Sequence, residues 1–477
     1  MKKKLALLAF VCTASIWART DKTFLTVKPH SMNLVHEMLI SQRVIEDLNE
    51  DQKGFVFQTT PFYQASVNDK DLARYFLLNN KDTLAFATQT NNINADVDPR
   101  HFDLSSSYQG SISLRPTQKV VGNRVDYYYN FGYKVKGLFA GISPTIVHIE
   151  NSPKLFEEID SRAGFETILT AFSGGDLSSS WAENFQYGKI NGKQSDTEIE
   201  GVDLKIGWRA LKTDNLKLAI NGVFTIPTGH EATSKYLFEP VSGLNKHFGL
   251  GVGVHGDLRI AENSHDDTNW YLVGAANYKY IFQDKEVRTL ELKNKRWGRY
   301  LKMRKQNPRS TTNVLASAYP GVNALTREVK VTPGSHFEGL AALQYKAKGW
   351  GFNVGYNGWL KENESLKLRK SFSEPGIFGI VSSNATAGMP AETASVAVSS
   401  LTTIKEFQPA DGQFIQQHDV DFNGSSAAGS HKLFAMLNFE SEGKVEFFGS
   451  LAASYEIAQK NNSLEQWSAW GSLGIAF

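Results

Sequence analysis

The chain has little cysteine, little net charge and no long apolar run. Its one cysteine among 477 residues is Cys12, in a segment that reads as a signal peptide, so the exported chain has no disulfide framework. The formal charge is +2, which does not favour a nucleic-acid partner. No later apolar run approaches the ~20 residues that a membrane helix needs. These absences exclude a disulfide-rich secreted domain and a helical membrane protein.

The N-terminus carries the three parts of a secretory signal peptide. Lys2, Lys3 and Lys4 form a positive region, an apolar run follows, and Ala18 offers a small residue for cleavage. We therefore expect residues 1–18 to be removed. An exported chain of this kind is periplasmic, secreted or inserted in an outer membrane.

Long alternating segments predict an all-β protein. In the segment 444–457, for example, Val445, Phe447 and Leu451 share one face, and Glu446 and Ser450 share the other. Each segment is long enough for the ~9–11 residues of a tilted membrane strand, about twice the length usual in soluble sheets. The pattern therefore indicates a transmembrane antiparallel up-and-down β-barrel. Such segments start near residues 107, 124, 137, 198, 214, 247, 269, 335, 349, 429, 444 and 465.

The C-terminal stretch has the same alternation and ends on an aromatic residue. Leu473, Ile475 and Phe477 lie on one face of the last predicted strand. A terminal Phe preceded by apolar residues at every second position resembles the insertion signal of bacterial outer-membrane β-barrels. The resemblance implies recognition by the barrel-assembly machinery through Phe477, and the cell outer membrane of a Gram-negative-type bacterium as the location.

The strand count depends on the N-terminal part. Residues 31–50 read as an amphipathic helix, residues 54–66 as a strand and residues 81–88 as a shorter one. If both are barrel strands the barrel has fourteen, which we favour; if neither is, it has twelve. If only the longer one is, the chain must thread through the pore. The expected division is a helical plug or periplasmic segment at 19–53 and a barrel at 54–477 with long outer loops at 150–197, 227–246, 283–334 and 362–428.

Polar residues recur on the predicted lumen face. In a barrel they line an aqueous path or form ion pairs within the wall. The charged lumen-lining candidates are Arg115, Lys134, Lys205, Arg209, Lys217, Asp257, Arg259, Lys279, Glu338, Lys346, Lys361 and Glu446.

One predicted outer loop is strongly basic. We expect it to be solvated, to contact the phosphates of lipopolysaccharide and other outer-membrane lipids, or to fold inward as an anion-favouring constriction. Its basic residues are Lys293, Lys295, Arg296, Arg299, Lys302, Arg304 and Lys305.

Motifs for cofactors and metals fail on their context. The segment 251–256 matches GxGxxG, but it lies inside an alternating strand with no helix after it. No constellation of nucleophile, base or paired carboxylates rises above the polar background. We therefore expect no cofactor, no metal and no enzymatic activity.

Three functions fit such a barrel. A porin-like channel would pass small hydrophilic solutes through the polar lumen. A transporter of hydrophobic compounds is the alternative, because a barrel of fourteen strands with an N-terminal plug resembles the long-chain fatty-acid transporter family in architecture. The stretch 19–24 lacks the Asn-Pro-Ala-type motif expected there, so no binding residue is carried over. A structural barrel or adhesin that presents its loops is the third.

Overall fold

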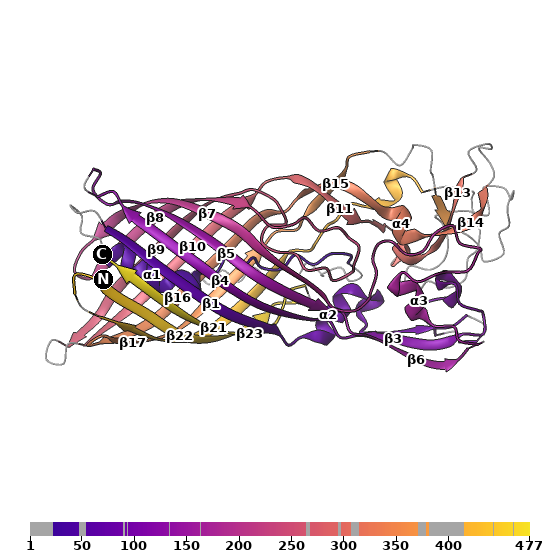
Figure 1. Ribbon diagram of the computed structural model, residues 1–477, viewed down its shortest axis with the longest axis horizontal. Coiled ribbons are helices and arrows are strands. Elements are labelled where there is room, and N and C mark those ends of the chain that lie inside the picture. The colour runs from indigo at the N-terminus through magenta and orange to yellow at the C-terminus, as the bar shows by residue number, and fades with distance from the viewer. Residues whose placement is uncertain are drawn as a thin grey trace, which may run out of the picture.

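Antiparallel strands close on themselves to form a barrel of twelve (Figure 1). The computed structural model describes residues 22–46, 54–88, 91–92, 94–132, 134–162, 164–263, 268–293, 297–306, 314–370, 378–380, 415–441, 443–460 and 462–477. The expected signal peptide lies outside these residues. In order around the wall the strands are β1 (Gly54–Ser66), β4 (Thr117–Asn130), β5 (Leu138–Ser152), β7 (Gln194–Lys212), β8 (Leu216–Pro227), β9 (Gly249–Asn263), β10 (Thr268–Ile281), β16 (Gly334–Ala347), β17 (Trp350–Lys361), β21 (Ala428–Glu440), β22 (Glu446–Ala458) and β23 (Gln466–Ala476).

The last strand closes the barrel against the first. Strand β23 pairs with β1 in antiparallel register, with Val56 opposite Ala476. Beside this seam the rings of Phe55 and Phe477 lie 3.6 Å apart between centroids. We call this end of the barrel the Phe477 rim and the opposite end the head rim.

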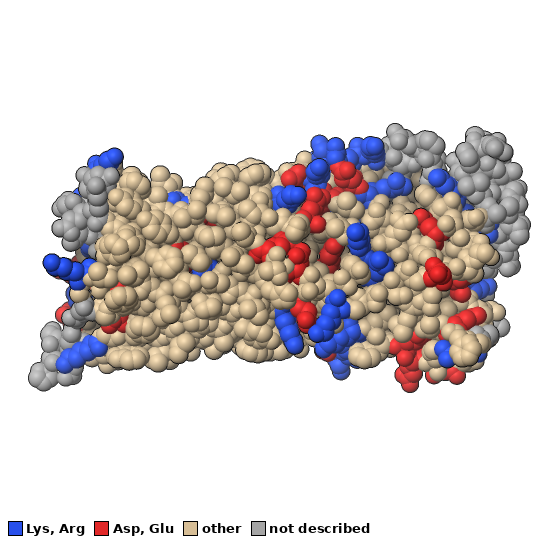
Figure 2. Space-filling model, viewed as in Figure 1, with Lys and Arg blue, Asp and Glu red and all other residues tan. Residues whose placement is uncertain are grey.

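The outer surface of the wall is apolar. Large side chains such as Val252 and Leu451 are 63% and 71% exposed. Figure 2 shows a wall almost free of charged side chains between the two rims. Among the described residues, no helix is long and apolar enough to cross a membrane.

The expectation of fourteen strands is wrong, and twelve is correct. Residues 83–86 and 109–114 form β2 and β3, which belong to a separate sheet with β6. With four and six residues, both are too short for the ~9–11 that a crossing requires. Only the longer N-terminal strand, β1, joins the barrel, so the threaded arrangement considered above is the one observed.

A folded head continues from the barrel beyond the head rim (Figure 1). The four expected long loops and the β1–β4 connection contribute to it. Buried aromatic residues form its core, including Phe102, Phe172, Trp297 and Tyr300, with the last two rings 4.7 Å apart. Its elements are α2 (Asp69–Phe76), β2 (Thr83–Phe86), β3 (Gln109–Leu114), β6 (Leu155–Ser161), α3 (Ile168–Ser173), β11 (Asp284–Thr289), β12 (Glu291–Leu292), β13 (Lys302–Gln306), β14 (Val314–Pro320), α4 (Gly321–Leu325), β15 (Thr326–Thr332), β18 (Ser365–Leu368), β19 (Phe378–Ile380) and β20 (Val420–Asp421).

The N-terminal segment runs through the lumen from the head toward the Phe477 rim. Its first described residue, Lys22, donates its backbone N–H to the carbonyl of Tyr75 in α2, at 3.0 Å. Helix α1 (Leu34–Glu46) then follows inside the barrel and starts three residues after the predicted position 31; residues 47–50 lie outside the described residues. It contacts β1, β8, β9, β10, β16 and β23, strands from opposite parts of the wall.

A buried histidine should make the head sensitive to acid. Burial lowers the pKa of His101 to about 3, and its Nδ1 accepts the backbone N–H of Lys302 at 3.0 Å. In the unfolded chain the imidazole takes up a proton near pH 6.5, whereas in the folded head it stays neutral down to about pH 3. The free energy of unfolding therefore keeps its full value above pH 6.5. It decreases as the pH drops toward 3, by about 2 kcal/mol at pH 5. Urea unfolding of the head, followed by tryptophan fluorescence between pH 7.5 and 5, measures this loss.

The matched variant is His101→Asn, which keeps an acceptor but does not titrate. We expect it to be less stable at pH 7.5 and to lose the pH dependence that His101 contributes. An unchanged slope in this variant would assign the acid sensitivity to another group. His247 cannot be that group, because the opposite sign applies to it: Glu286 outweighs its burial and raises its pKa, so its contribution is lost as pH rises.

Candidate functional site in the barrel lumen

Helix α1 fills the lumen with an apolar and a charged side. Val35, Ile40 and Val44 are fully or almost fully buried against the wall. At its N-terminus, the carboxylate of Glu338 on β16 accepts the N–H of Leu34 at 3.2 Å. An anion at this end satisfies an unpaired N–H and complements the helix dipole. The wall therefore fixes where the helix starts.

Glu37 connects the helix to two strands. One carboxylate oxygen lies 2.7 Å from Nη2 of Arg124 on β4, and the other lies 2.8 Å from Nζ of Lys205 on β7. All three side chains are buried. A buried charge is tolerated only with such partners, so the helix neutralises cations of the wall that would otherwise face an empty lumen.

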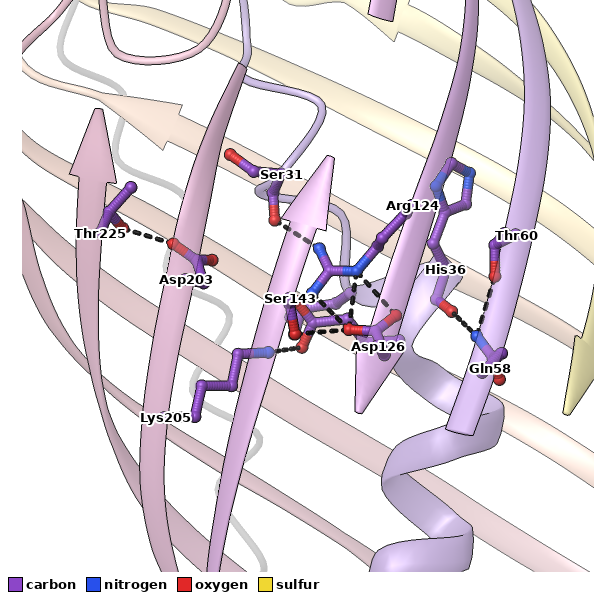
Figure 3. Close-up of polar contacts among 12 residues, drawn as sticks. Ser31, His36, Gln58, Thr60, Arg124, Asp126, Ser143, Asp203, Lys205 and Thr225 are labelled. Carbon is purple, nitrogen blue, oxygen red and sulfur yellow. Dashed lines mark hydrogen bonds and ion pairs between the residues drawn. The ribbon is translucent and has the colours of Figure 1, made fainter. Parts of the chain in front are cut away.

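Arg124 is held by further contacts (Figure 3). Its Nε lies 3.0 Å from both carboxylate oxygens of Asp126, and its Nη1 donates to the carbonyl of Ser31 at 2.7 Å. Ser143 on β5 donates to Asp126 at 2.6 Å. The guanidinium thus joins the wall, the helix and the stretch before the helix in one network.

The stretch before the helix is bound to the wall as well. Lys28 Nζ contacts Glu338 at 2.7 Å and Asn357 at 3.2 Å. Glu200 on β7 accepts the backbone N–H groups of His30 and Ser31 at 2.6 and 3.0 Å. These charge-assisted bonds hold the extended stretch 28–31 across the part of the lumen nearer the head rim.

At the Phe477 rim the end of the helix meets two acidic residues. Arg43 pairs with Glu440 and lies 3.3 Å from Glu446. Next to it, Gln42 donates to Gln344 on β16 at 2.8 Å. Contacts between the N-terminal segment and the wall therefore run from the head rim to the Phe477 rim.

At the head rim a charged clasp holds the extended stretch 22–28. The guanidinium of Arg288 on β11 lies 3.1 Å from the centroid of the Phe24 ring and contacts Glu286 at 2.6 Å and Glu364 at 3.5 Å. Burial opposes ionisation of Glu364, but Arg288 and Lys361 outweigh it and lower its pKa to about 2. The clasp therefore stays charged at neutral pH.

Loss of the clasp should release the stretch 22–28. In Arg288→Gln the two carboxylates lose their shared buried cation, which costs about 3–5 kcal/mol for a broken buried pair. We expect chymotrypsin to cleave after Phe24, whose ring Arg288 covers, in this variant and not in the parent. The control is Arg327→Gln. Arg327 is exposed and is the register partner of Arg288 on the neighbouring strand β15. Equal cleavage of parent and Arg288→Gln would show that the clasp does not retain the segment.

The structure distributes the predicted lumen residues over several places. Lys205, Arg209, Asp257, Lys279, Glu338 and Lys361 are buried on barrel strands. Lys217, Arg259, Lys346 and Glu446 lie in the wall toward the Phe477 rim.

Two of these residues lie outside the lumen. Arg115 follows β3, which is a head strand, and it lies 3.6 Å from Asp82. Lys134 lies in an exposed turn because β4 ends at Asn130. The pattern failed here because alternation continues past the barrel wall.

The basic loop is part of the head. Arg299 is buried, pairs with Glu291 at 2.6 Å and is not available to phosphates. Lys302 and Lys305 lie over the rings of Trp181 and Phe378 at 5.1 and 6.0 Å. Lys293 is exposed and Arg304 half-buried. Lys295 and Arg296 lie outside the described residues.

A cluster of possible metal ligands at the head rim was not predicted. Asp196, Glu198 and His230 each place one donor atom within 4.8 Å of the others. The Nδ1 atom of His230 already contacts Glu198 at 2.6 Å, and this hydrogen bond raises the pKa of the imidazole. His230 is 32 residues from Glu198 in sequence, so spacing alone gives no signal. The exposed His230 and the largely buried Glu198 form an ion pair, and this contact alone accounts for the cluster.

The structure shows a closed twelve-stranded antiparallel barrel, and the comparisons with known proteins assign the chain to no family. No family model matches it, and no curated protein does.

Solved structures align over most of the chain at very low identity. The toluene transporter TodX of Pseudomonas putida is 8% identical, with 96% of this chain and 95% of that one covered and a TM-score of 0.34. The translocator domain of the autotransporter NalP from Neisseria meningitidis is 9% identical, with 93% and 96% covered and a TM-score of 0.33. A FadL homologue of Pseudomonas aeruginosa is 8% identical, with 89% and 90% covered and a TM-score of 0.28. At such scores these alignments assign no function to this chain.

Proposed function

We propose that the chain is an outer-membrane transport barrel of a Gram-negative-type bacterium whose polar lumen is closed by its own N-terminal segment. Small hydrophilic solutes would pass when that segment moves. The observation that carries the proposal is Glu37, bound between Arg124 and Lys205 within a lumen lined by charged groups. A polar lining suits hydrated solutes better than hydrophobic compounds.

The fold suggests an orientation for the barrel. Outer-membrane barrels have short turns on the periplasmic side and long loops outside. The connections at the Phe477 rim are short, such as 213–215 and 348–349, and the long ones enter the head. We therefore place the Phe477 rim in the periplasm, where the barrel-assembly machinery would meet Phe477, and the head at the cell surface.

The head supports a second function. Its buried core includes residues from α2, α3, α4, β12 and β15. Loops that are merely solvated at the end of a barrel do not need such a core. Presentation of a folded head at the cell surface is therefore the second candidate function. It requires no passage of solute.

Osmotic swelling of proteoliposomes separates the two. We expect little influx of small sugars through the intact chain and clear influx through a variant that lacks residues 19–53, which include helix α1. Absence of sugar influx through this variant in vesicles that contain it as a folded barrel would favour the presentation function. Binding of alkyl-chain ligands in the lumen without sugar influx would favour a hydrophobic-compound transporter.

A further inference from the structure

Three lysines stand side by side on the outward face of the head sheet β11–β15–β18. Lys330 on β15 is the register partner of Lys285 on β11 and of Lys367 on β18. Directly opposed side chains have Cβ atoms about 4.5–5.5 Å apart, so the three ammonium groups form a row. All three are exposed, and none has an ion-pair partner in the part of the chain that the structure describes.

This lysine row has too little nearby negative charge to balance it. Glu328 on the same strand already pairs with Arg369. Glu231 interacts electrostatically with Lys285. Like charges directly opposite one another destabilise a sheet. A multivalent anion bound to the row would relieve that repulsion.

The row lies just beyond the apolar part of the wall. Strand β11 follows β10, whose exposed Tyr280 has its ring 5.4 Å from that of Phe282. Aromatic residues of this kind mark the membrane interface of a barrel. Lys285 comes three residues later, about 10 Å further along an extended chain. Figure 2 shows Lys and Arg side chains beyond the apolar wall, at the level of β11 and β15 in Figure 1. The row therefore lies where the phosphates of an outer leaflet would be.

An apolar groove lies on the outward face of strands β7–β10, between the lysine row and the Phe477 rim. Its volume is about 660 Å³, and its lining includes Ile206, Gly222, Val252 and Tyr278. A Cβ atom at Gly222 would meet no atom closer than 4.0 Å, so the missing side chain keeps the groove open. A groove of this chemistry in the membrane-facing surface accommodates an acyl chain.

We propose that this face binds a phosphorylated glycolipid of the outer leaflet, with phosphate on the lysine row and an acyl chain in the groove. The order along the wall, from apolar groove through aromatic residues to lysine row, matches the order of acyl chains, interface and phosphates in such a lipid. The site is separate from the lumen, and its position relies on the membrane orientation proposed above.

Native mass spectrometry of the detergent-purified full chain tests the site with lipid A as the probe. The variant is Lys285→Gln/Lys330→Gln/Lys367→Gln, and the control is Lys70→Gln/Lys235→Gln/Lys444→Gln, which removes exposed lysines elsewhere. We expect the first variant to bind lipid A about 10- to 100-fold more weakly, from the contribution of a lysine near anionic lipid. The control should bind like the parent.

Two further arms identify the ligand chemistry. Gly222→Leu should fill the groove and weaken lipid A binding, and dephosphorylated lipid A should bind the parent weakly. The proposal would be overturned if the row variant bound lipid A as tightly as the parent, or if the control variant lost as much affinity as the row variant. It would also be overturned if inorganic phosphate displaced lipid A as well as lipid A itself does. None of these outcomes depends on conductance, so the lumen function is tested separately.

Discussion

Removal of residues 19–53 should open the barrel to ions. In a planar bilayer we expect the conductance of this variant to exceed that of the intact chain by roughly tenfold or more, because a polar lumen freed of its helix becomes a water-filled path. Strand β1 begins at Gly54, so all twelve strands remain.

Two controls make this result interpretable. Heat-modifiable migration in gels shows whether the shortened barrel is folded. A synthetic peptide of residues 19–53, added from either side, should reduce the current if the segment is a true occupant of the lumen. A folded variant with the conductance of the parent would mean that residues 19–53 do not close the pathway.

Arg124→Met should strongly weaken attachment of the helix. Methionine has a side chain of similar length but no charge. Glu37 would then keep only its ion pair with Lys205, and Asp126 would keep its hydrogen bond from Ser143. Breaking a buried ion pair by removing one partner costs about 3–5 kcal/mol. The gel transition temperature of the folded barrel should therefore fall, and brief channel openings should appear in bilayers.

A double-mutant cycle with Glu37→Gln tests the reason. Because the neutral amide no longer needs the guanidinium, Arg124→Met should cost much less in the Glu37→Gln background than in the parent. Additive losses would show that Arg124 acts through Asp126 and Ser31 alone. The exposed Lys193, which contacts Glu150 at 3.1 Å, offers a surface ion pair for comparison. Such pairs contribute about 0–1 kcal/mol.

The sequence predicted the barrel because alternation is a local property of each strand. Eleven of the twelve segments first identified correspond to barrel strands. The segment near 107 does not, since β3 alternates like a membrane strand but is too short to cross. Its place is taken by Gly54–Ser66, so the strand number depends on topology that a single segment does not reveal.

The contacts of the lumen could be predicted only in part. Lys205 and Glu338 were found because they share a face with other polar residues. Arg124 lies on the same face as Asp126 and was overlooked, although the alternation contained it. Glu37 gave no signal, since a carboxylate on an amphipathic helix is usually solvated. Only the threading of residues 22–46 through the barrel brings Glu37 to its partners.

Cross-linking of the helix to the wall tests the central claim, that the N-terminal segment lies inside the barrel. Gln42→Cys/Gln344→Cys places two thiols where the side chains now touch at 2.8 Å. We predict rapid linkage by a short bis-maleimide in intact outer membranes. In the matched pair Gln42→Cys/Leu343→Cys, the second thiol is on the exposed outward face of the same strand and should not link. Linkage in both pairs, or in neither, would contradict a helix in the lumen.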